Sequence, residues 1–386
     1  MSEKREAFIV DTCRTPRAKR KGVFSGIHPI DLMTYPLNGI VERNKISPES
    51  IEDVILGCVT QTGEQGWCVA RGAVLGAGWP ISVPGTTINR LCGSGQQATN
   101  FGASTIQAGN ADLIVSGGLE HMTRVPMFSD TGGEPSPALN SHHPDLVQQG
   151  ESAEIMAEEF KLSREEIDAF ALSSQMKAKE ALDNKRFQGS LIPVSYQEAE
   201  SGQSGILEAD NNPRPETTAE ALAGLKTVFR DNGVITAGNA SAIVDGAAAI
   251  LLASESAIKK HSLKPRARIA SMAAIGSPPR IMLTGPIEAS RQAVARAGLK
   301  LQDIDLWEIN EAFAPVPLVT IKELGIDGER VNVNGGAIAL GHPLGATGAI
   351  LLGTLLDEME RRNVQYGCST MCIGLGMGIA TVLERV

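Results

Sequence analysis

Cys92 is the residue of this sequence best suited to covalent chemistry. It lies in Thr87-Ile-Asn-Arg-Leu-Cys92-Gly-Ser-Gly-Gln-Gln97, and the Ala- and Gln-rich run 96–107 is typical of a helix. The N–H groups and dipole at a helix N-terminus favour negative charge, so we expect a lowered pKa for this thiol and a stronger nucleophile. We also expect the adjacent glycines to let a substrate approach the backbone closely. Taken alone, a cysteine in apolar surroundings is more often a small buried hydrophobic residue.

Three further glycine-bounded turns contain residues that complement a thiol. Asn310 follows an apolar strand-like run, His342 lies in Asn334-Gly-Gly-Ala-Ile-Ala-Leu-Gly-His342-Pro-Leu-Gly, and Cys372 precedes Ile-Gly-Leu-Gly-Met-Gly. The proline and glycines around His342 fix its loop and orient the imidazole. A cysteine with a histidine is an activated sulfur nucleophile. A hydrolase needs only one thiol, whereas an enzyme that makes or breaks carbon–carbon bonds also needs a base for the proton next to a carbonyl, and the second thiol can supply it.

The strands and helices that must position these turns occur twice in the same order. The first half predicts buried strands over 54–58 and 112–118 on either side of the helix that follows Cys92. The second half predicts strands over 303–310 and 368–374 on either side of a helix over 349–361. We therefore predict an α/β protein of two similar halves, each with a mostly parallel sheet. A ligand is expected where strand ends and helix N-termini of both halves meet.

A region of different composition interrupts this repeat. Clusters of Pro, Ser, Asp and Asn divide it, and one helix is clear because Ser163 and Glu166 form a capping box ahead of a helical apolar period. We predict three parts: an N-terminal half over 1–118 plus 246–265, an inserted loop-rich lobe over 119–245, and a C-terminal half over 266–386.

Composition argues against several other classes of protein. The chain has 386 residues, 42% hydrophobic and 20% charged, with a net charge of -9, which fits a folded globular protein and disfavours a dedicated nucleic-acid binder. Of the six cysteines only Cys368 and Cys372 are near neighbours, so we expect reduced thiols, no metal site and a cytoplasmic protein. The N-terminus lacks the apolar core of a signal peptide. No run approaches the ~20 apolar residues of a membrane span.

Four segments together resemble the signatures of the thiolases, the acetyl-CoA C-acyltransferases. They are Asn89-Arg-Leu-Cys92-Gly-Ser-Gly, Asn310-Glu-Ala-Phe-Ala, the His342 segment quoted above and Cys372-Ile-Gly374, in the family's order, and the resemblance covers essentially the whole chain. It implies the thiolase fold, two α/β halves in αβαβα layers with an inserted CoA-binding lobe. It also implies cleavage of 3-oxoacyl-CoA by CoA into acetyl-CoA and a shortened acyl-CoA, reversibly, through an acyl-cysteine intermediate.

The resemblance further implies a role for each site residue. Cys92 is then the nucleophile, His342 its activating base, and Cys372 the acid and base for the alpha proton. Asn310 then holds a water that forms one oxyanion site with His342, and the N–H groups of Cys92 and Gly374 form the other. The positions that match family contacts to CoA are Arg214, Phe229, Ala237 and Ser241, with Met282 and Phe313 along the pantetheine tunnel.

The resemblance also carries expectations about ligands and partners. Coenzyme A is then a co-substrate, with no permanently bound cofactor. Thiolases form homodimers or homotetramers, and a hydratase/dehydrogenase subunit of a fatty-acid oxidation complex is a possible further partner. The two residues Phe229 and Met282 can equally be plain core residues.

Two departures from the family pattern bear on the substrate. Gln148-Gln149-Gly150 replaces the His-Met-Gly of several biosynthetic thiolases, which weakens the case for acetoacetyl-CoA. The last motif, with Leu375 and the tail 378–386, and Arg214-Pro-Glu-Thr-Thr218 resemble most the degradative 3-ketoacyl-CoA thiolases of bacteria. The alternatives are a biosynthetic acetoacetyl-CoA thiolase, a ketoacyl synthase-type condensing enzyme, and an inactive thiolase-like protein that binds CoA or lipid. The second thiol argues against the condensing enzyme, and the intact catalytic residues argue against the inactive protein.

Overall fold

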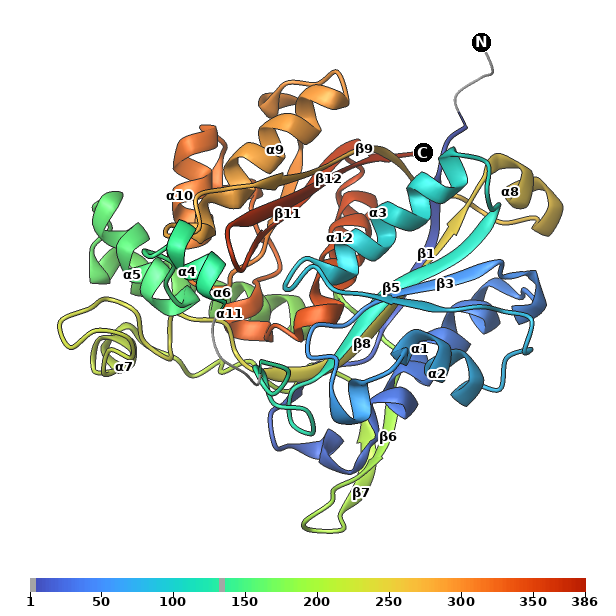
Figure 1. The fold of residues 1–386 in the computed structure, drawn as a ribbon, viewed down its shortest axis with the longest axis horizontal. Helices are drawn as coiled ribbons and strands as arrows, with labels where there is room; N and C mark the ends of the chain where they lie inside the picture. Colours follow the sequence, from blue (N-terminus) through green and yellow to red (C-terminus); the bar gives the residue numbers. More distant parts are fainter. Residues whose placement is uncertain (1–4, 132–135) are drawn as a thin grey trace.

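The computed structural model describes residues 5–131 and 136–386, and one 10-stranded sheet runs through both halves of the chain (Figure 1). The strand order is β10-β11-β12-β9-β1-β8-β5-β3-β4, with β2 beside β8. The strands of the first half are β1 (Phe8–Arg14), β2 (Ala18–Lys19), β3 (Asp53–Gly57), β4 (Thr86–Ile88), β5 (Leu113–His121) and β8 (Val244–Ala253). Those of the second half are β9 (Ala267–Gly276), β10 (Leu306–Ile309), β11 (Tyr366–Ile373) and β12 (Met377–Arg385).

The two halves pair their strands in the same way, which confirms the predicted repeat. In the first half β3 is parallel to β5, and β8 runs antiparallel between β5 and β1. In the second half β10 is parallel to β11, and β12 runs antiparallel between β11 and β9. The main strands other than β8 and β12 therefore share one direction within their half, as the prediction of mostly parallel sheets requires. A short antiparallel contact between β1 and β9, at Ile9 and Ala267, joins the halves.

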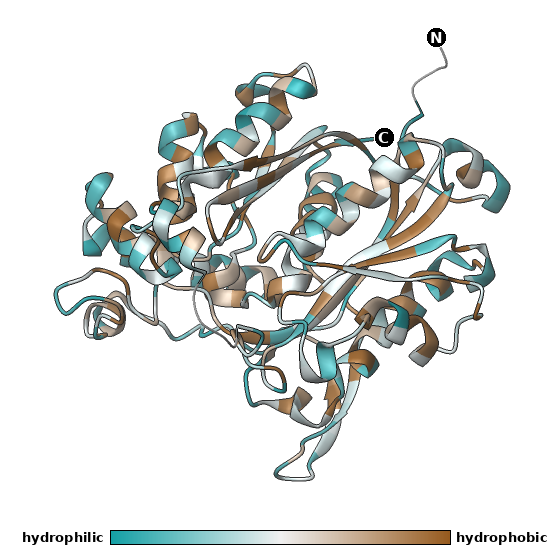
Figure 2. Ribbon diagram, viewed as in Figure 1, coloured by the Kyte–Doolittle hydropathy of each residue, from teal (hydrophilic) through white to brown (hydrophobic). Residues whose placement is uncertain are grey.

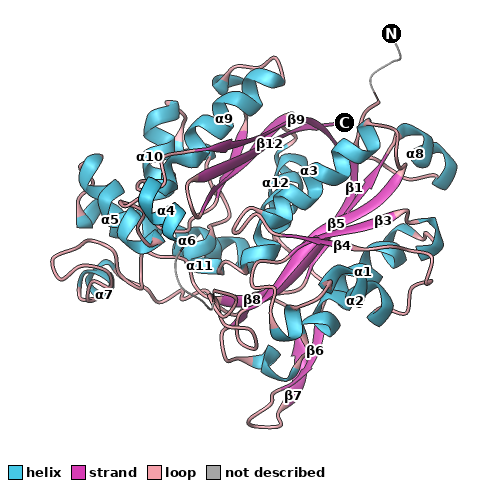
Figure 3. Ribbon diagram, in the orientation of Figure 1, coloured by secondary structure: helices cyan, strands magenta, loops and turns pink. Residues whose placement is uncertain are grey.

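Helices form three layers around the two halves of the sheet (Figure 3). The helices α3 and α12 lie between the halves and contact strands of both, α1 and α2 cover the outer face of the first half, and α9 covers that of the second, with α10 packed on α9. This is the αβαβα arrangement expected from the thiolase resemblance. The bounds are α1 (Pro29–Asn44), α2 (Val69–Gly76), α3 (Ser94–Gln107), α8 (Glu255–His261), α9 (Gly285–Arg296), α10 (Pro315–Leu324), α11 (Ala337–Leu340) and α12 (Leu344–Arg362).

Three buried apolar clusters fill the spaces between these layers. One joins α1 and α2 to the first half of the sheet, one surrounds α3 and α12, and one joins α9 and α10 to the second half. Because β5 and β8 are covered on both faces, every residue of both strands is buried, and their sequences are mostly apolar or small, apart from Glu120 and His121 in β5 and Asp245 in β8. Figure 2 shows these central strands as mainly hydrophobic, with polar residues on the outer helices.

Glycines at the crossing of α3 and α12 bring the two central helices into close contact. A Cβ on Gly95 would lie 2.6 Å from the carbonyl oxygen of Gly345, and one on Gly348 would lie 2.3 Å from the backbone nitrogen of Gln96. A Cβ on Gly93 would lie 2.5 Å from the side chain of Ile373. The expectation that glycines beside Cys92 open the backbone to substrate is therefore wrong, since they serve the packing of the two halves.

The inserted lobe follows β5 and returns at β8. It contains α4 (Pro137–His142), α5 (Gln149–Glu159), α6 (Arg164–Asp183), α7 (Ala219–Ala223) and a hairpin of β6 (Val194–Gln197) and β7 (Ser204–Leu207). The capping box at Ser163 and Glu166 starts α6 as predicted. The lobe is more helical than expected, because α5 is buried over most of its length and so has little amphipathic periodicity. The boundaries proposed for the three parts stay a prediction.

Within the described residues, none of the helices is long and apolar enough to cross a lipid bilayer.

Candidate active site

The N-termini of α3 and α12 meet at the predicted site. Cys92 directly precedes Gly93, the N-cap residue of α3, and His342 directly precedes Pro343, the N-cap residue of α12. From the second half of the sheet, Cys372 lies near the end of β11. The structure therefore brings together elements of both halves, as the sequence predicted.

Direct contacts tie the second half to the Cys92 sulfur. The backbone N–H groups of Gly374 and of Cys92 itself lie near enough to this sulfur to act against the rise of its pKa. Cys372 lies close enough that a negative charge on Cys92 raises its pKa.

Thr347, on the first turn of α12, fixes the imidazole of His342. The Thr347 hydroxyl donates to the carbonyl oxygen of Pro343 at 2.9 Å, and the same Oγ1 lies 2.6 Å from Nδ1 of His342. Because its one proton is already used, Thr347 Oγ1 accepts from Nδ1–H. The lone pair of a neutral His342 is therefore on Nε2, where the Nδ2 of Asn310 approaches to 3.4 Å. Sequence reasoning missed Thr347, although it stands four residues after Pro343 in the same motif.

Burial keeps the catalytic groups uncharged at neutral pH. It lowers the pKa of His342 to about 3. It also raises the pKa of Cys92, against the lowering effect of donors from Gln149, Gly374 and Cys92 itself, and it raises that of Cys372 well above the usual value. The expectation of a lowered thiol pKa for Cys92 is therefore wrong for the resting site, because loss of hydration outweighs the donors at the helix N-terminus.

The backbone next to Asn310, at the end of β10, is fixed by paired hydrogen bonds between Ile309 and the side chain of Asn332. The side chain of Asn332 accepts from the N–H of Ile309 and donates to its carbonyl, both at 2.8 Å, and it also donates to Glu311 at 2.9 Å. The Oδ1 atom of Asn310 is buried and has no hydrogen-bond partner among the described residues. A buried acceptor without a partner is suited to bind a water molecule.

Glu120 links the loops of the site from beneath, and no role was predicted for it. Its buried carboxylate accepts from the N–H groups of Val59 at 2.9 Å, Thr60 at 3.1 Å and Gly345 at 2.9 Å, and from the side chain of Gln65 at 2.8 Å. The carboxylate thus stabilises the N-terminal turn of α12 that follows the catalytic histidine. The available signal was an acidic residue inside an apolar strand.

A cavity of about 510 Å³ opens onto the nucleophile. It is lined by Val59, Thr60, Leu91, Cys92, Met127, Phe128, Asp130, Thr131, Val147, Gln148, Gln149, Met282, Leu344, Gly374 and Leu375. The Nε2 of Gln149, on the first turn of α5, donates to the Cys92 sulfur at 3.8 Å. The sequence marked Gln149 only as a departure from the family pattern, so this contact was missed.

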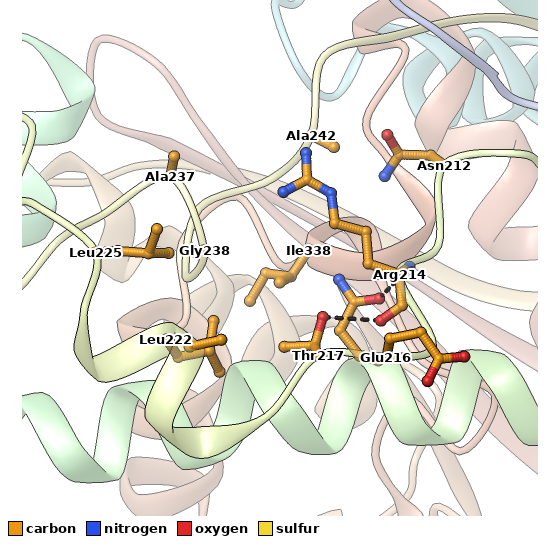
Figure 4. Close-up of a pocket in the computed structure, with 12 residues that line it drawn as sticks. Asn212, Arg214, Glu216, Thr217, Leu222, Leu225, Ala237, Gly238, Ala242 and Ile338 are labelled. Carbon is orange, nitrogen blue, oxygen red and sulfur yellow. Dashed lines mark hydrogen bonds between the residues drawn. The ribbon is translucent and has the colours of Figure 1, made fainter.

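A second cavity, of about 330 Å³, lies in the inserted lobe (Figure 4). Arg214 and Ala237, two of the predicted CoA contacts, line it together with Ala242. In Figure 4 the guanidinium of Arg214 points across the pocket between Ala237 and Ala242, and it has no hydrogen-bond partner in the part of the chain that is described. The carbonyl of Ala242 accepts from the N–H of His342 at 2.9 Å, so this cavity reaches the backbone of the catalytic centre.

The other predicted CoA contacts occupy the space between the lobe and the second half. Phe229 and Phe313 form an edge-to-face pair with ring centroids 6.0 Å apart. Ser241 donates its N–H to the carbonyl of Ala312 at 2.9 Å, beside Phe313. Met282 lines the Cys92 cavity and not the one at Arg214. The residues named as CoA contacts therefore lie in more than one place, and their binding role stays a prediction.

Comparison with known proteins agrees with this geometry over the whole chain. The family model "Thiolase, N-terminal domain" matches residues 7–256, and "Thiolase, C-terminal domain" matches residues 263–385. The chain is 46% identical to a beta-ketoadipyl-CoA thiolase of Escherichia coli (99% of this chain, 100% of the relative). It is also 46% identical to the 3-ketoacyl-CoA thiolase FadA of Escherichia coli (99% and 100%) and 44% identical to a steroid 3-ketoacyl-CoA thiolase of Mycobacterium tuberculosis (99% and 94%).

The fold matches a solved structure of the same family. The crystal structure of human mitochondrial 3-ketoacyl-CoA thiolase superimposes with a TM-score of 0.90 at 38% identity, covering 99% of each chain. With both family models matched and relatives similar over their full lengths, the chain belongs to the thiolase family.

Proposed function

We propose that this thiolase cleaves 3-oxoacyl-CoA with CoA, giving acetyl-CoA and a shortened acyl-CoA. The observation that carries the proposal is the meeting of Cys92 and His342 at the N-termini of α3 and α12, with the second thiol, Cys372, near the end of β11 and close enough that a charge on Cys92 raises its pKa. A neutral imidazole with its lone pair on Nε2 completes the set. One thiol can hold an acyl group while the other manages a proton at carbon, which is what carbon–carbon cleavage requires.

In the first half-reaction Cys92 gives its proton to Nε2 of His342 and its sulfur attacks the 3-oxo carbon. The oxyanion that forms is stabilised by one of two donor sets: the N–H groups of Cys92 and Gly374, or His342 with a water on Asn310. As the tetrahedral adduct collapses, the bond between the alpha carbon and the former 3-oxo carbon breaks. Its electron pair takes a proton from Cys372, releasing acetyl-CoA and leaving the acyl group on Cys92.

In the second half-reaction a new CoA enters the site. The Cys372 thiolate takes the proton of the CoA thiol, and the CoA sulfur attacks the acyl carbon on Cys92. The adduct expels Cys92 as a thiolate, which recovers its proton from His342. Shortened acyl-CoA leaves, and every group returns to its starting protonation state.

We assign CoA to the lobe at 119–245, with its pantetheine arm passing towards His342. The unpartnered guanidinium of Arg214 supports this assignment, because it can pair with a phosphate. Ala237, Ser241 and the ring of Phe313 follow on the route inward. The large cavity at Cys92 then remains for the acyl chain.

Assembly and location are further parts of the proposal. The family resemblance supports a homodimer or homotetramer, with a hydratase/dehydrogenase subunit as a possible additional partner, in the cytoplasm. Light scattering at micromolar concentration tests the first point, and a stable monomer would contradict it.

A thiolysis assay tests the function. CoA-dependent loss of the enolate absorbance of a 3-oxoacyl-CoA should require Cys92, and mass spectrometry of the enzyme without CoA should find one acyl group on that residue. A Cys92→Ala variant that folds but neither cleaves nor acylates is the expected control. Turnover that survives this substitution, or condensation without any thiolysis, would overturn the proposal in favour of an inactive or ketoacyl synthase-type protein.

The synthetic direction, condensation of two acetyl-CoA molecules to acetoacetyl-CoA, is the second candidate because the same chemistry is reversible. Comparing thiolysis of acetoacetyl-CoA with that of longer 3-oxoacyl-CoA distinguishes the two.

A further inference from the structure

The cavity at Cys92 has almost no charge on its walls. Eight of its lining residues have apolar side chains: Val59, Leu91, Met127, Phe128, Val147, Met282, Leu344 and Leu375. Among the lining residues that the structure describes, Asp130 is the one with a charged side chain, and it is exposed. Gln149, which reaches the nucleophile, is neutral.

The described segments that supply one wall of the cavity contain no Lys or Arg. They are residues 125–131 and 136–160, and they contain six acidic residues. Next to the opposite wall, Arg90 places its Nη1 3.9 Å from the sulfur of Met377, and Arg280 pairs with Glu159 at 2.8 Å. Neither of these arginines lines the cavity.

The two cavities differ in the charged side chains that line them. Asp130 lines the cavity at Cys92, whereas Arg214 lines the cavity in the lobe together with Glu216. Among the described residues, a cation therefore lines the proposed CoA side of the site and not the acyl side.

We propose that the Cys92 cavity selects 3-oxoacyl chains that end in an uncharged apolar group and rejects chains that end in a carboxylate. This inference rests on the proposed function. A short dicarboxylic chain, with its carboxylate a few bonds from the reacting carbonyl, would be desolvated among apolar side chains, beside Asp130 and without a cationic partner. An alkyl chain of equal length is stabilised by the same walls.

The test is a comparison of two substrates with equal numbers of carbons, 3-oxohexanoyl-CoA and 3-oxoadipyl-CoA. We expect kcat/KM for thiolysis to be at least ~100-fold higher for 3-oxohexanoyl-CoA, because a site that leaves a charged group unpaired discriminates strongly. Values within about threefold of each other would overturn the inference while leaving the thiolase function intact. Cleavage of neither substrate would overturn the proposed function, and this inference with it.

A charge-reversal variant tests the part played by Asp130. Asp130→Lys should raise the ratio of kcat/KM for 3-oxoadipyl-CoA to kcat/KM for 3-oxohexanoyl-CoA about tenfold. Asp145→Lys is the matched control, since Asp145 is exposed on the same acidic stretch but does not line the cavity. If both variants shifted the substrate ratio equally, general surface charge would explain the preference and the role of the cavity would be refuted.

Discussion

The hydroxyl of Thr347 gives the sharpest test of how the site works, because it sets the tautomer of His342 without touching the nucleophile. It uses its proton on the carbonyl of Pro343 and so can only accept from the imidazole. Thr347→Val removes the acceptor and keeps the shape of the side chain. The His342 Nδ1–H is then buried without a partner, or the ring changes to the tautomer that has its proton on Nε2.

The size of the effect follows from either outcome. An unpaired buried donor costs about 1–3 kcal/mol, so the reactive tautomer becomes less favourable by a similar amount. If the ring changes tautomer, Nε2 no longer accepts the proton of Cys92. The acylation rate then falls in proportion to the fraction of His342 that keeps its proton on Nδ1. At about 1.4 kcal/mol per factor of ten, we expect acylation of Cys92 to slow by roughly 10-fold to 100-fold.

Single-turnover acylation by acyl-CoA, followed by mass spectrometry, measures this step directly. Thr347→Ser restores the hydroxyl and should restore most of the rate. Thr320→Val is the matched control, since Thr320 is buried on α10 and makes the same bond to a carbonyl four residues earlier, at 2.7 Å, away from the site. If Thr347→Val and Thr320→Val lost the same stability and both acylated Cys92 at a near-normal rate, the role of Thr347 in setting the tautomer of His342 would be refuted.

Four other expectations concern the thiols and the histidine. Cys372→Ala should still take up one acetyl group on Cys92 from labelled acetyl-CoA, but thiolysis and deuterium exchange at the alpha carbon should fall by ~10²–10⁴. Gln149→Met should slow alkylation of Cys92 at a given pH, because a hydrogen-bond donor to the sulfur is lost, while Gln148→Met should not. Equal alkylation rates in the two variants would show that the Gln149 contact has no effect on the thiol. Iodoacetamide labelling of Cys92 should rise steeply above pH 8, following its raised pKa, and a plateau below pH 7 would contradict this. The pKa of His342 is about 3 in the folded protein, against 6.5 for the ordinary group, so the unfolded chain binds the proton more readily. The contribution of His342 to stability is therefore full above about pH 6.5 and declines as the pH falls towards 3. This would be contradicted if the urea midpoint of the wild type fell no more with pH than that of His342→Asn.

The fold and the principal site residues could be predicted from the sequence because their signals are local. A capping box predicted α6, and apolar runs bounded by glycine predicted β5 and β11. The repeat of these elements in both halves predicted that Cys92 and His342 would lie at the N-termini of corresponding helices, and both do.

Apart from Thr347, whose partners are local, the misses depend on contacts between distant parts of the chain. Gly95 and Gly348 serve a helix crossing whose existence no local pattern reveals. Glu120 binds backbone groups that come from two separate segments. The raised pKa of Cys92 depends on its burial, which only the assembled halves create, whereas the helix N-terminus that suggested a lowered value is local.

The uncharged resting state of the site fits the cleavage direction. A Cys372 that rests as a thiol has the proton that the departing carbon needs, so cleavage can begin without a preceding deprotonation. Cys92 and His342 likewise separate charge only when a bound carbonyl can accept it, in reach of the two N–H donors. If both thiols rested as thiolates, their charges would repel across a dry interior. Condensation is the reverse of these steps and begins with acyl transfer to Cys92, in which the Cys372 thiol gives its proton to the departing CoA. The Cys372 thiolate that removes an alpha proton arises only in that step. Burial of the thiols therefore favours the acid role of Cys372 in the first step, and exchange of the alpha protons of acetyl-CoA should be lost in Cys92→Ala.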